Sequence, residues 1–497
     1  MHDAHGQARW TVSIPQTYAF PLRPHHYREI CSQADDMSGK AASTERGRRL
    51  NRKREGSSRK GDRDYYAIDR GFIDVDEAER QGLLPIVSQN GIATAERGHE
   101  ERRVEGCRTS LTFVMETSEA GFGNTLLMLW MSYGLAKKEG RAFFIDDTRW
   151  PYGKYASYFP AIPQPSCSAP PSSHILPCPR HARHLLVSAA TAPWISGRSF
   201  STEFVASRRH VLERQKQIFD LLRTGYKDLF QLVGDDAPYL DRRIRDVKNC
   251  TNPNAAIIGL HIRRGDCHPH ELQFSRDYLP LDKYTSAATD ILARRTSNVR
   301  DSSNGLHSTA ASDIASLLNQ TGSKILLASD DPDLYPLVDL SFTTQAQDRI
   351  TLASKTALDK SDPKTPIRAD GSAYTKHIDE NIGWEGGFFP SLFWSLGQSS
   401  TSSLTRLSRL PSFSGPYDSE TDNEDESVPE PVMQLRNYVG RAYLLDLAVL
   451  GHSSDEIVCA VSSAACRILA VMMGWDALKE GRWKNVDGGT SWSWDGN

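Results

Sequence analysis

Short apolar segments that end in polar or charged residues recur along the chain and predict buried β-strands. The three strongest lie in the second half, at residues 256–262, 324–328 and 456–461. Two more occur in the first half, at residues 111–115 and 142–145. Continuous apolar runs of this length are typical of strands that are covered on both faces, as in a parallel sheet.

Helical patterns lie between the predicted strands. A glycine-containing turn at residues 121–123 leads into a predicted helix from residue 124 to about residue 139, which Gly140 ends. Residues 203–234 are predicted to be mostly helical, because their apolar positions recur at helical spacing. Alternating strands and helices predict an α/β fold with a parallel sheet, whose ligands sit at the carboxyl ends of the strands.

Polar stretches interrupt this pattern. The first 105 residues are poorly patterned, so we expect a poorly ordered N-terminal linker there. Three polar insertions are expected to be disordered surface loops, at residues 294–323, 355–379 and 398–431.

The overall charge argues against a surface built for nucleic acid. Lys and Arg number 59 against 62 Asp and Glu, which gives a formal net charge of −3. Residues 45–64 are nevertheless basic, and they are either a solvated linker or a nuclear address or nucleic-acid patch. We expect the linker, and no nucleic-acid partner.

No segment has the composition of a membrane span. The most apolar window, residues 457–475, contains Arg467 near its middle, and a charge at the bilayer centre costs about 2.5–3.5 kcal/mol. Residues 1–39 contain no apolar h-region, so no targeting segment is visible in the sequence. The eight cysteines are too few for a disulfide scaffold and leave the redox compartment open.

Two motifs at strand ends predict an anion site. The turn Gly121-Phe122-Gly123-Asn124 allows backbone N–H groups to approach an anion at a helix N-terminus, although a plain strand-to-helix turn is the alternative. The motif His261-Ile262-Arg263-Arg264-Gly265-Asp266 follows an apolar strand. Adjacent arginines there need partners, and an anion such as phosphate suits their guanidinium groups. A structural Arg–Asp cluster is the other interpretation.

Two further motifs lie near the other strong strands. Ser329-Asp330-Asp331-Pro332 offers paired carboxylates, which bind a metal, orient arginines or cap a helix. Asp446 precedes the stretch 458–467, in which two serines join a strand to a helix. Their hydroxyl and amide groups cap the helix or bind phosphate.

These motifs, in this order, resemble the GDP-fucose-dependent fucosyltransferases, in particular the α-1,6 (core-type) enzymes and the rhizobial chitin-oligosaccharide fucosyltransferases. The resemblance runs from about Cys107 to Trp475 and includes Arg149-Trp150-Pro151-Tyr152. It implies a two-lobed, GT-B-like glycosyltransferase with a Rossmann-like donor-binding lobe. The implied units are a stem (1–105), an N-terminal α/β lobe (106–250), the donor-binding lobe (251–480) and a tail (481–497).

The resemblance also implies which residues bind the donor: Gly121, Tyr152, His261, Arg263, Asp446 and Ser463. Arg263 would hold the β-phosphate, assisted by backbone at Gly121 and Ser463. The guanine would contact His261 and Asp446, and the ribose would contact Tyr152.

The implied reaction is an inverting transfer of L-fucose from GDP-fucose to a glycan hydroxyl, without a metal or cofactor. Glu271 falls where the family carries the carboxylate taken as general base, which accepts the hydroxyl proton. Arginine charge stabilises the leaving diphosphate, and Arg264 would shape the catalytic site together with Asp330 and Asp331. Cys267 is a departure, because the family usually has a basic residue there.

The acceptor and the compartment follow less directly. We expect α-1,6 transfer to a GlcNAc of an N-glycan or a chitin oligosaccharide, and a non-catalytic relative that binds nucleotide-sugar or glycan is the alternative. Such transferases are normally anchored in the Golgi, so we expect the Golgi lumen, through an anchor that this chain lacks. The resemblance further implies the disulfides Cys459–Cys466 and Cys107–Cys167, which need an oxidising compartment.

Overall fold

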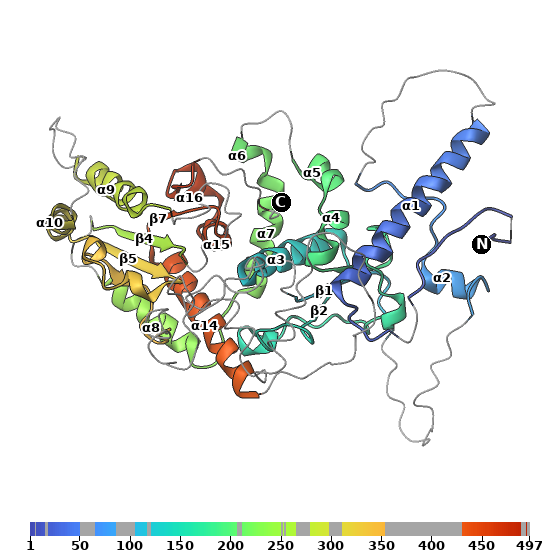
Figure 1. The fold of residues 1–497 in the computed structure, drawn as a ribbon, viewed down its shortest axis with the longest axis horizontal. Coiled ribbons are helices and arrows are strands. Elements are labelled where there is room, and N and C mark those ends of the chain that lie inside the picture. The colour runs from blue at the N-terminus through green and yellow to red at the C-terminus, as the bar shows by residue number, and fades with distance from the viewer. Residues whose placement is uncertain are drawn as a thin grey trace, which may run out of the picture.

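The computed structural model describes residues 1–4, 6–14, 18–49, 65–85, 105–116, 121–205, 211–249, 252, 255–264, 279–297, 311–352, 430–488 and 494. Strands β4, β5 and β7 gather on one side of the molecule and strands β1 and β2 on the other (Figure 1). Helices α3, α7, α14 and α15 lie between the two groups of strands.

Two parallel sheets carry the fold. Their strand orders are β2–β1–β3 and β6–β5–β4–β7–β8, and all neighbouring strands run parallel. The strands span Ser110–Val114 (β1), Ala142–Asp146 (β2), His184–Val187 (β3), Ile257–Ile262 (β4), Lys324–Ser329 (β5), Thr344–Gln345 (β6), Glu456–Cys459 (β7) and Trp483–Asn485 (β8). The predicted mixed α/β architecture with parallel sheets is confirmed.

The helices cover these sheets and connect them. They span Pro24–Arg49 (α1), Val75–Arg80 (α2), Phe122–Glu139 (α3), Ala192–Ile195 (α4), Arg198–Phe204 (α5), Val211–Arg214 (α6), Lys216–Leu229 (α7), Asp236–Lys248 (α8), Leu281–Ser297 (α9), Ala311–Thr321 (α10), Glu430–Ser453 (α14), Ala464–Met473 (α15) and Trp475–Lys479 (α16).

Helices α3 and α7 pack closely at the centre of the molecule. A Cβ on Gly134 would lie 2.2 Å from the carbonyl oxygen of Leu221, and one on Gly225 would lie 2.3 Å from that of Trp130. The two backbones therefore approach each other where neither helix carries a side chain. One hydrophobic cluster continues from these helices to Leu111 of β1 and Leu326 of β5, so the two sheets share a core.

The five predicted strands and the predicted helix at 124–139 lie within two residues of their observed bounds. The structure differs from the prediction in the first 105 residues, where helix α1 is 26 residues long. The side chains of Trp10 and Val12 are buried there, and a disulfide joins Cys31 of α1 to Cys178. Covalent and apolar contacts with a distant loop stabilise this region, and its own polar composition did not reveal them.

Two other polar segments also contain regular structure. Helix α10 lies inside the predicted insertion 294–323. It is stabilised by Ile314 and Leu318, which form a short apolar stripe that packs on the second sheet. Strand β8 lies in the predicted tail and extends the second sheet, although its three residues are too few to show a pattern. The insertion 355–379 and residues 398–429 lie outside the described residues. No helix in the described ranges is long and apolar enough to cross a bilayer.

Candidate functional site

The arginine motif leaves the carboxyl end of β4 beside the aspartate motif that follows β5. His261 is a buried residue of β4, and its register partner in β5 is Ala328. The backbone N–H of Arg264 donates to Asp330 Oδ1 at 2.6 Å, and the Asp330 side chain is buried. Asp330 therefore fixes the path of the chain after β4, which sets where the half-buried Arg263 and Arg264 side chains begin.

Asp331 has a local structural role. Its carboxylate accepts a hydrogen bond at 3.0 Å from the backbone N–H of Asp333, which caps the short 3₁₀ helix Pro332–Leu334. Burial raises the pKa of Asp331 despite this hydrogen bond. The sequence left open a metal site, the orientation of arginines or a helix cap for this pair. The geometry gives Asp331 the capping role, and Asp330 positions Arg264 through its backbone N–H.

The two serines of the C-terminal motif begin helix α15. Ser463 is fully buried, and its Oγ accepts a hydrogen bond at 3.2 Å from the backbone N–H of Ala465. Arg263 reaches this turn, where its Nη1 donates to the carbonyl oxygen of Ser462 at 3.5 Å. A disulfide joins Cys459, the last residue of β7, to Cys466 in the first turn of α15. The cation from β4 and the start of α15 therefore lie together.

The first turn of α3 packs against the first turn of α15. A Cβ on Gly123 would lie 2.8 Å from the Cβ of Ala464 and 2.6 Å from the hydroxyl oxygen of Tyr443. Across the same junction, Arg467 Nη2 donates to Asn124 Oδ1 at 2.7 Å. Gly123 is therefore the glycine whose lack of a side chain matters here. Gly121, which the resemblance singled out, precedes α3 with a φ of −66° that any residue adopts.

This junction brings together three sources of positive charge. Helix N-termini present unpaired N–H groups and a partial positive charge, and those of α3 and α15 are adjacent here. The Arg263 guanidinium contacts the residue immediately before Ser463. Residues more than 300 positions apart thus form a site with the chemistry to bind an anionic group such as a diphosphate.

Asp446 lies on α14, which packs against β4 and β5. Burial raises the pKa of its carboxyl well above the usual range, while a backbone N–H from Gln347 acts in the opposite direction. Its Oδ1 atom is enclosed and accepts no hydrogen bond from the described residues. A buried carboxylate oxygen of this kind is suited to a ligand that brings N–H donors.

Tyr152 is placed differently from its expected role at a ribose. Its side chain is fully buried, and its ring packs edge-on against Phe122 with centroids 4.8 Å apart. Trp150 and Tyr158 belong to the same aromatic cluster. In this structure Tyr152 therefore packs beneath the start of α3, and its ring is not open to a ligand.

Other predicted residues are placed as follows. Cys107 and Cys167 form a disulfide with a Cα–Cα distance of 4.9 Å, which ties the segment before β1 to the proline-rich loop. Glu271 and Cys267 lie outside the described residues. Within those residues, no three His, Cys, Asp or Glu side chains are grouped to hold a metal ion.

Sequence reasoning missed two residues of this junction. Gly123 and Arg467 both stand within quoted motifs, but neither was given a role. The second glycine of the turn was the available signal for Gly123, whereas the contact of Arg467 with Asn124 depends on tertiary packing.

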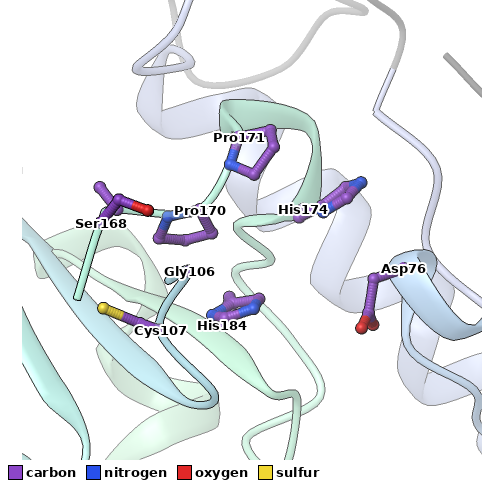
Figure 2. Close-up of a pocket in the computed structure, with 9 residues that line it drawn as sticks. Asp76, Gly106, Cys107, Ser168, Pro170, Pro171, His174 and His184 are labelled. Atoms are coloured by element: carbon purple, nitrogen blue, oxygen red, sulfur yellow. The ribbon is translucent and has the colours of Figure 1, made fainter. Parts of the chain in front are cut away.

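A cavity of about 400 Å³ lies elsewhere, at the amino ends of β1 and β3 (Figure 2). Cys107 is the one predicted residue that lines it. His184 Nδ1 lies 2.9 Å from Ser110 Oγ, and His174 Nε2 lies 3.2 Å from Glu79 Oε2, so both rings already have protein partners. The junction of α3 and α15 is instead at the carboxyl ends of the strands, as expected for parallel sheets.

No protein-family model and no curated protein matches the chain. Some solved structures resemble it at low sequence identity. A crystal structure of NodZ α-1,6-fucosyltransferase soaked with GDP-fucose has a TM-score of 0.29 and 9% identity, over 73% of this chain and 92% of that chain. One co-crystallised with GDP has a TM-score of 0.30 and 11% identity, over 73% and 91%. Fucosyltransferase NodZ from Bradyrhizobium has a TM-score of 0.28 and 9% identity, over 73% and 92%. The function proposed below rests on the residues of this chain.

Proposed function

We propose that the protein is an inverting glycosyltransferase that transfers L-fucose from GDP-fucose to a glycan hydroxyl. The observation that carries this proposal is the meeting of two helix N-termini with Arg263. An arginine and oriented backbone N–H groups neutralise the charge that develops on a leaving diphosphate, so no metal ion is needed for that step. The two-lobed GT-B-like arrangement belongs to the same proposal.

The buried carboxylate supports a guanine base. Guanine presents two adjacent N–H donors, at N1 and at the exocyclic N2, and one carboxylate accepts both. Asp446 has an enclosed oxygen available for such donors, and it lies on the helix that packs on β4, the strand that leads to Arg263. We assign Asp446 and His261 to the base, and Arg263 with the α3–α15 junction to the diphosphate.

The acceptor step needs a general base. We propose that Glu271 takes the proton of the acceptor hydroxyl as the oxygen attacks the anomeric carbon and GDP leaves. The bond to the acceptor forms as the bond to the diphosphate breaks, which inverts the anomeric centre. The proposed acceptor is a GlcNAc of an N-glycan or of a chitin oligosaccharide, in α-1,6 linkage.

A lumenal compartment is also proposed. Six cysteines pair into three disulfides, and such bonds persist in oxidising compartments. This supports the secretory pathway, with the Golgi lumen as the expected site of action.

A non-catalytic relative is the second candidate. Cys267 stands where related enzymes usually have a basic residue, so this side chain cannot supply the phosphate contact that a cation would make there. Such a protein would bind GDP-fucose or a glycan without transferring the sugar.

GDP release distinguishes the two candidates. Purified protein is supplied with GDP-fucose and a panel of N-glycan and chitin acceptors in buffer containing EDTA. The proposed function predicts GDP release that depends on both the donor and one class of acceptor. Tight GDP binding in calorimetry without acceptor-dependent release would favour the non-catalytic relative. A lack of GDP binding would exclude the transferase, and a lack of both GDP and glycan binding would exclude both candidates.

A further inference from the structure

Residues 345–350 begin at the last residue of strand β6 and are held by several hydrogen bonds next to Asp446. Ala346 is bound to the sheet through its backbone N–H, which donates to the carbonyl oxygen of Leu327 at 2.8 Å. Gln347 closes the turn with its own side chain. Its Oε1 accepts from the backbone N–H groups of Arg349 and Ile350, both at 2.9 Å. We call residues 345–350 the β6 loop.

The β6 loop presents a backbone N–H to the carboxyl that we assign to the base. That N–H belongs to Gln347, and it favours the ionised form of Asp446 against the effect of burial. Gln347 itself is buried. The loop therefore orients the Asp446 carboxyl and favours its ionised form, although burial has the larger influence on its pKa.

One face of helix α8 holds the β6 loop through hydrogen bonds. Asp236, Tyr239 and Arg243 are spaced at i, i+3 and i+7, so they share one helix face. Tyr239 donates its hydroxyl to Asp348 Oδ1 at 2.6 Å and accepts from the Asp348 backbone N–H at 2.9 Å. Arg243 donates to the carbonyl oxygens of Ala346 and Gln345, at 2.9 and 2.6 Å.

The same helix face is also fixed to the helix that carries Asp446. Asp236 is buried and accepts two hydrogen bonds from Arg441 of α14, at 2.6 and 2.7 Å, and one from Arg349 of the loop at 2.9 Å. A buried carboxylate with two arginine partners is firmly held, because moving either arginine would leave its charge unpaired. Loop, α8 and α14 therefore form one connected unit around Asp446.

We infer that this face of α8 sets the base specificity of the donor site, by positioning the β6 loop against Asp446. The inference rests on the proposed function and adds positioning residues to it, since Tyr239 and Arg243 act on the nucleotide only through Gln347 and Asp446. Loosening the loop should weaken selection for the N–H edge of guanine, whereas the contacts of Arg263 and of the α3–α15 junction with the diphosphate do not involve the loop and should keep their strength.

The test compares the affinities of GDP, IDP and ADP by calorimetry on the full chain. IDP differs from GDP in lacking the exocyclic N2 amine, so the GDP-to-IDP affinity ratio reports that hydrogen bond. Tyr239→Phe and Arg243→Gln should lower this ratio by about tenfold and change ADP affinity less than about twofold. Arg243→Lys keeps one donor and should restore part of the ratio.

Arg245→Gln is the matched control, because Arg245 is exposed on the same helix two residues further on. An unchanged GDP-to-IDP ratio in Tyr239→Phe and Arg243→Gln would overturn the inference, and so would an equal loss of all three nucleotides. Failure of the proposed function gives a different result: the unmodified chain would not prefer GDP, or Asp446→Asn would leave its preference unchanged.

Discussion

Both sheets carry carboxylates at their carboxyl edges, but only the five-stranded sheet has arginines directly after one of its described strands. At the end of the strands of the three-stranded sheet lie Glu116, Asp146 and Ser188, and each forms hydrogen bonds with nearby backbone. Glu116 accepts from the N–H of Ala190, Asp146 accepts from the N–H of Thr148, and Ser188 takes part in a capping box. The edge of the five-stranded sheet has similar carboxylates after β5, and in addition it has Arg263 and Arg264 directly after β4.

The comparison shows that each sheet supplies a different part of the site. The five-stranded sheet contributes side-chain cations and the start of α15, whereas the three-stranded sheet contributes the start of α3 and no cation directly after its strands β1 and β3. Gly123 allows the two contributions to meet. The predictions below test this division, starting with the largest expected effect.

Replacing Glu271, which follows the cations of β4 in the sequence, should have the largest effect. Glu271→Gln keeps the size of the side chain but cannot take a proton, so we expect turnover to fall by about 10²–10⁴-fold. GDP affinity should stay nearly unchanged, because the base acts on the acceptor. Single-turnover kinetics with saturating donor measure the first quantity and calorimetry the second. Turnover within a few-fold of the unmodified protein would show that another group is the base.

Removing Arg263, one of the two arginines that follow β4, should remove most of the affinity for the diphosphate. Arg263→Ala is expected to weaken GDP binding by about 10²-fold, and Arg263→Lys should restore only part of it, because lysine lacks the planar fork of donors. Lys154→Ala is the control. Lys154 is a cation that follows β2 of the other sheet and pairs with Asp147 at an exposed position. Equal GDP affinity in calorimetry for Arg263→Ala and Lys154→Ala would contradict the assignment of the donor site.

Adding a side chain at Gly123, where α3 contacts α15, should lower both the stability of the protein and its affinity for GDP. Gly123→Ala places a methyl group against Ala464 and Tyr443, and overpacking of this kind costs about 1–3 kcal/mol. We expect a lower midpoint of urea denaturation and roughly tenfold weaker GDP binding, since the two helix N-termini must separate.

The control for that change is Gly39→Ala in α1, where an added Cβ would meet nothing within 4 Å. Alanine is the better helix former, so the free energy of unfolding should rise by about 0.5–1 kcal/mol. If Gly123→Ala and Gly39→Ala shift the midpoint in the same direction, the close approach at Gly123 is not a tight contact.

The sequence predicted five of the eight strands in the described ranges closely, but it missed β3, β6 and β8 and the junction between the two sheets. Apolar runs such as 324–328 are local signals, so the positions of these strands in the sequence can be predicted. The approach of Gly123 to Ala464 and the pairing of Arg467 with Asn124 join residues more than 300 positions apart, and no local pattern encodes them. Helix α1 was missed for the same reason, since Cys178 and the other partners of its buried side chains lie far along the chain.

The roles that the resemblance implied for single residues could be judged only from the burial and hydrogen bonds of their side chains. The sequence alone allows several functions for the paired carboxylates after β5. Two hydrogen bonds distinguish these functions: Asp330 accepts the backbone N–H of Arg264, and Asp331 caps a short helix by accepting that of Asp333. Tyr152 fits a ribose contact by motif position, but its ring is enclosed by aromatic neighbours. The β6 loop could not be found from the sequence, because its residues form no motif and their partners on α8 lie more than 100 positions away in the chain.

The disulfides of the two regions should affect binding unequally. Cys459→Ser with Cys466→Ser removes the bond that holds the first turn of α15 and should weaken GDP binding by about three- to tenfold. Cys107→Ser with Cys167→Ser removes a bond near the amino end of the other sheet and should leave GDP affinity unchanged. Each pair should also lower stability by about 2–4 kcal/mol. Calorimetry after secretory expression, with peptide mapping under non-reducing conditions, tests both; free alkylation of Cys459 and Cys466 in the unmodified protein would contradict the bond itself.

The last prediction concerns the pH dependence of GDP affinity, which we expect to arise from Asp446 beside the five-stranded sheet. Burial raises the pKa of Asp446, so this carboxyl takes up a proton at a higher pH than an ordinary aspartate as the solution is acidified. The neutral acid is the form that burial favours, so without ligand this group contributes stability at low pH that is lost as the pH rises through its raised pKa. The ionised form is the one that accepts both guanine N–H groups, and GDP affinity should therefore fall as the pH falls. Tyr335 is another titratable group near this carboxyl, and its own pKa is raised by burial and by the Asp446 charge.

Asp446→Asn separates this effect from the titration of the nucleotide. The phosphate of GDP also takes up a proton near pH 6, which weakens binding in every variant. We expect the GDP affinity of the unmodified protein to fall about three- to tenfold more than that of Asp446→Asn between pH 7.5 and pH 5.5. Parallel pH profiles for the two proteins in calorimetry would mean that Asp446 does not bind the base in its ionised form, and the distinction between the two carboxyl edges would then rest on Arg263 and the helix N-termini alone.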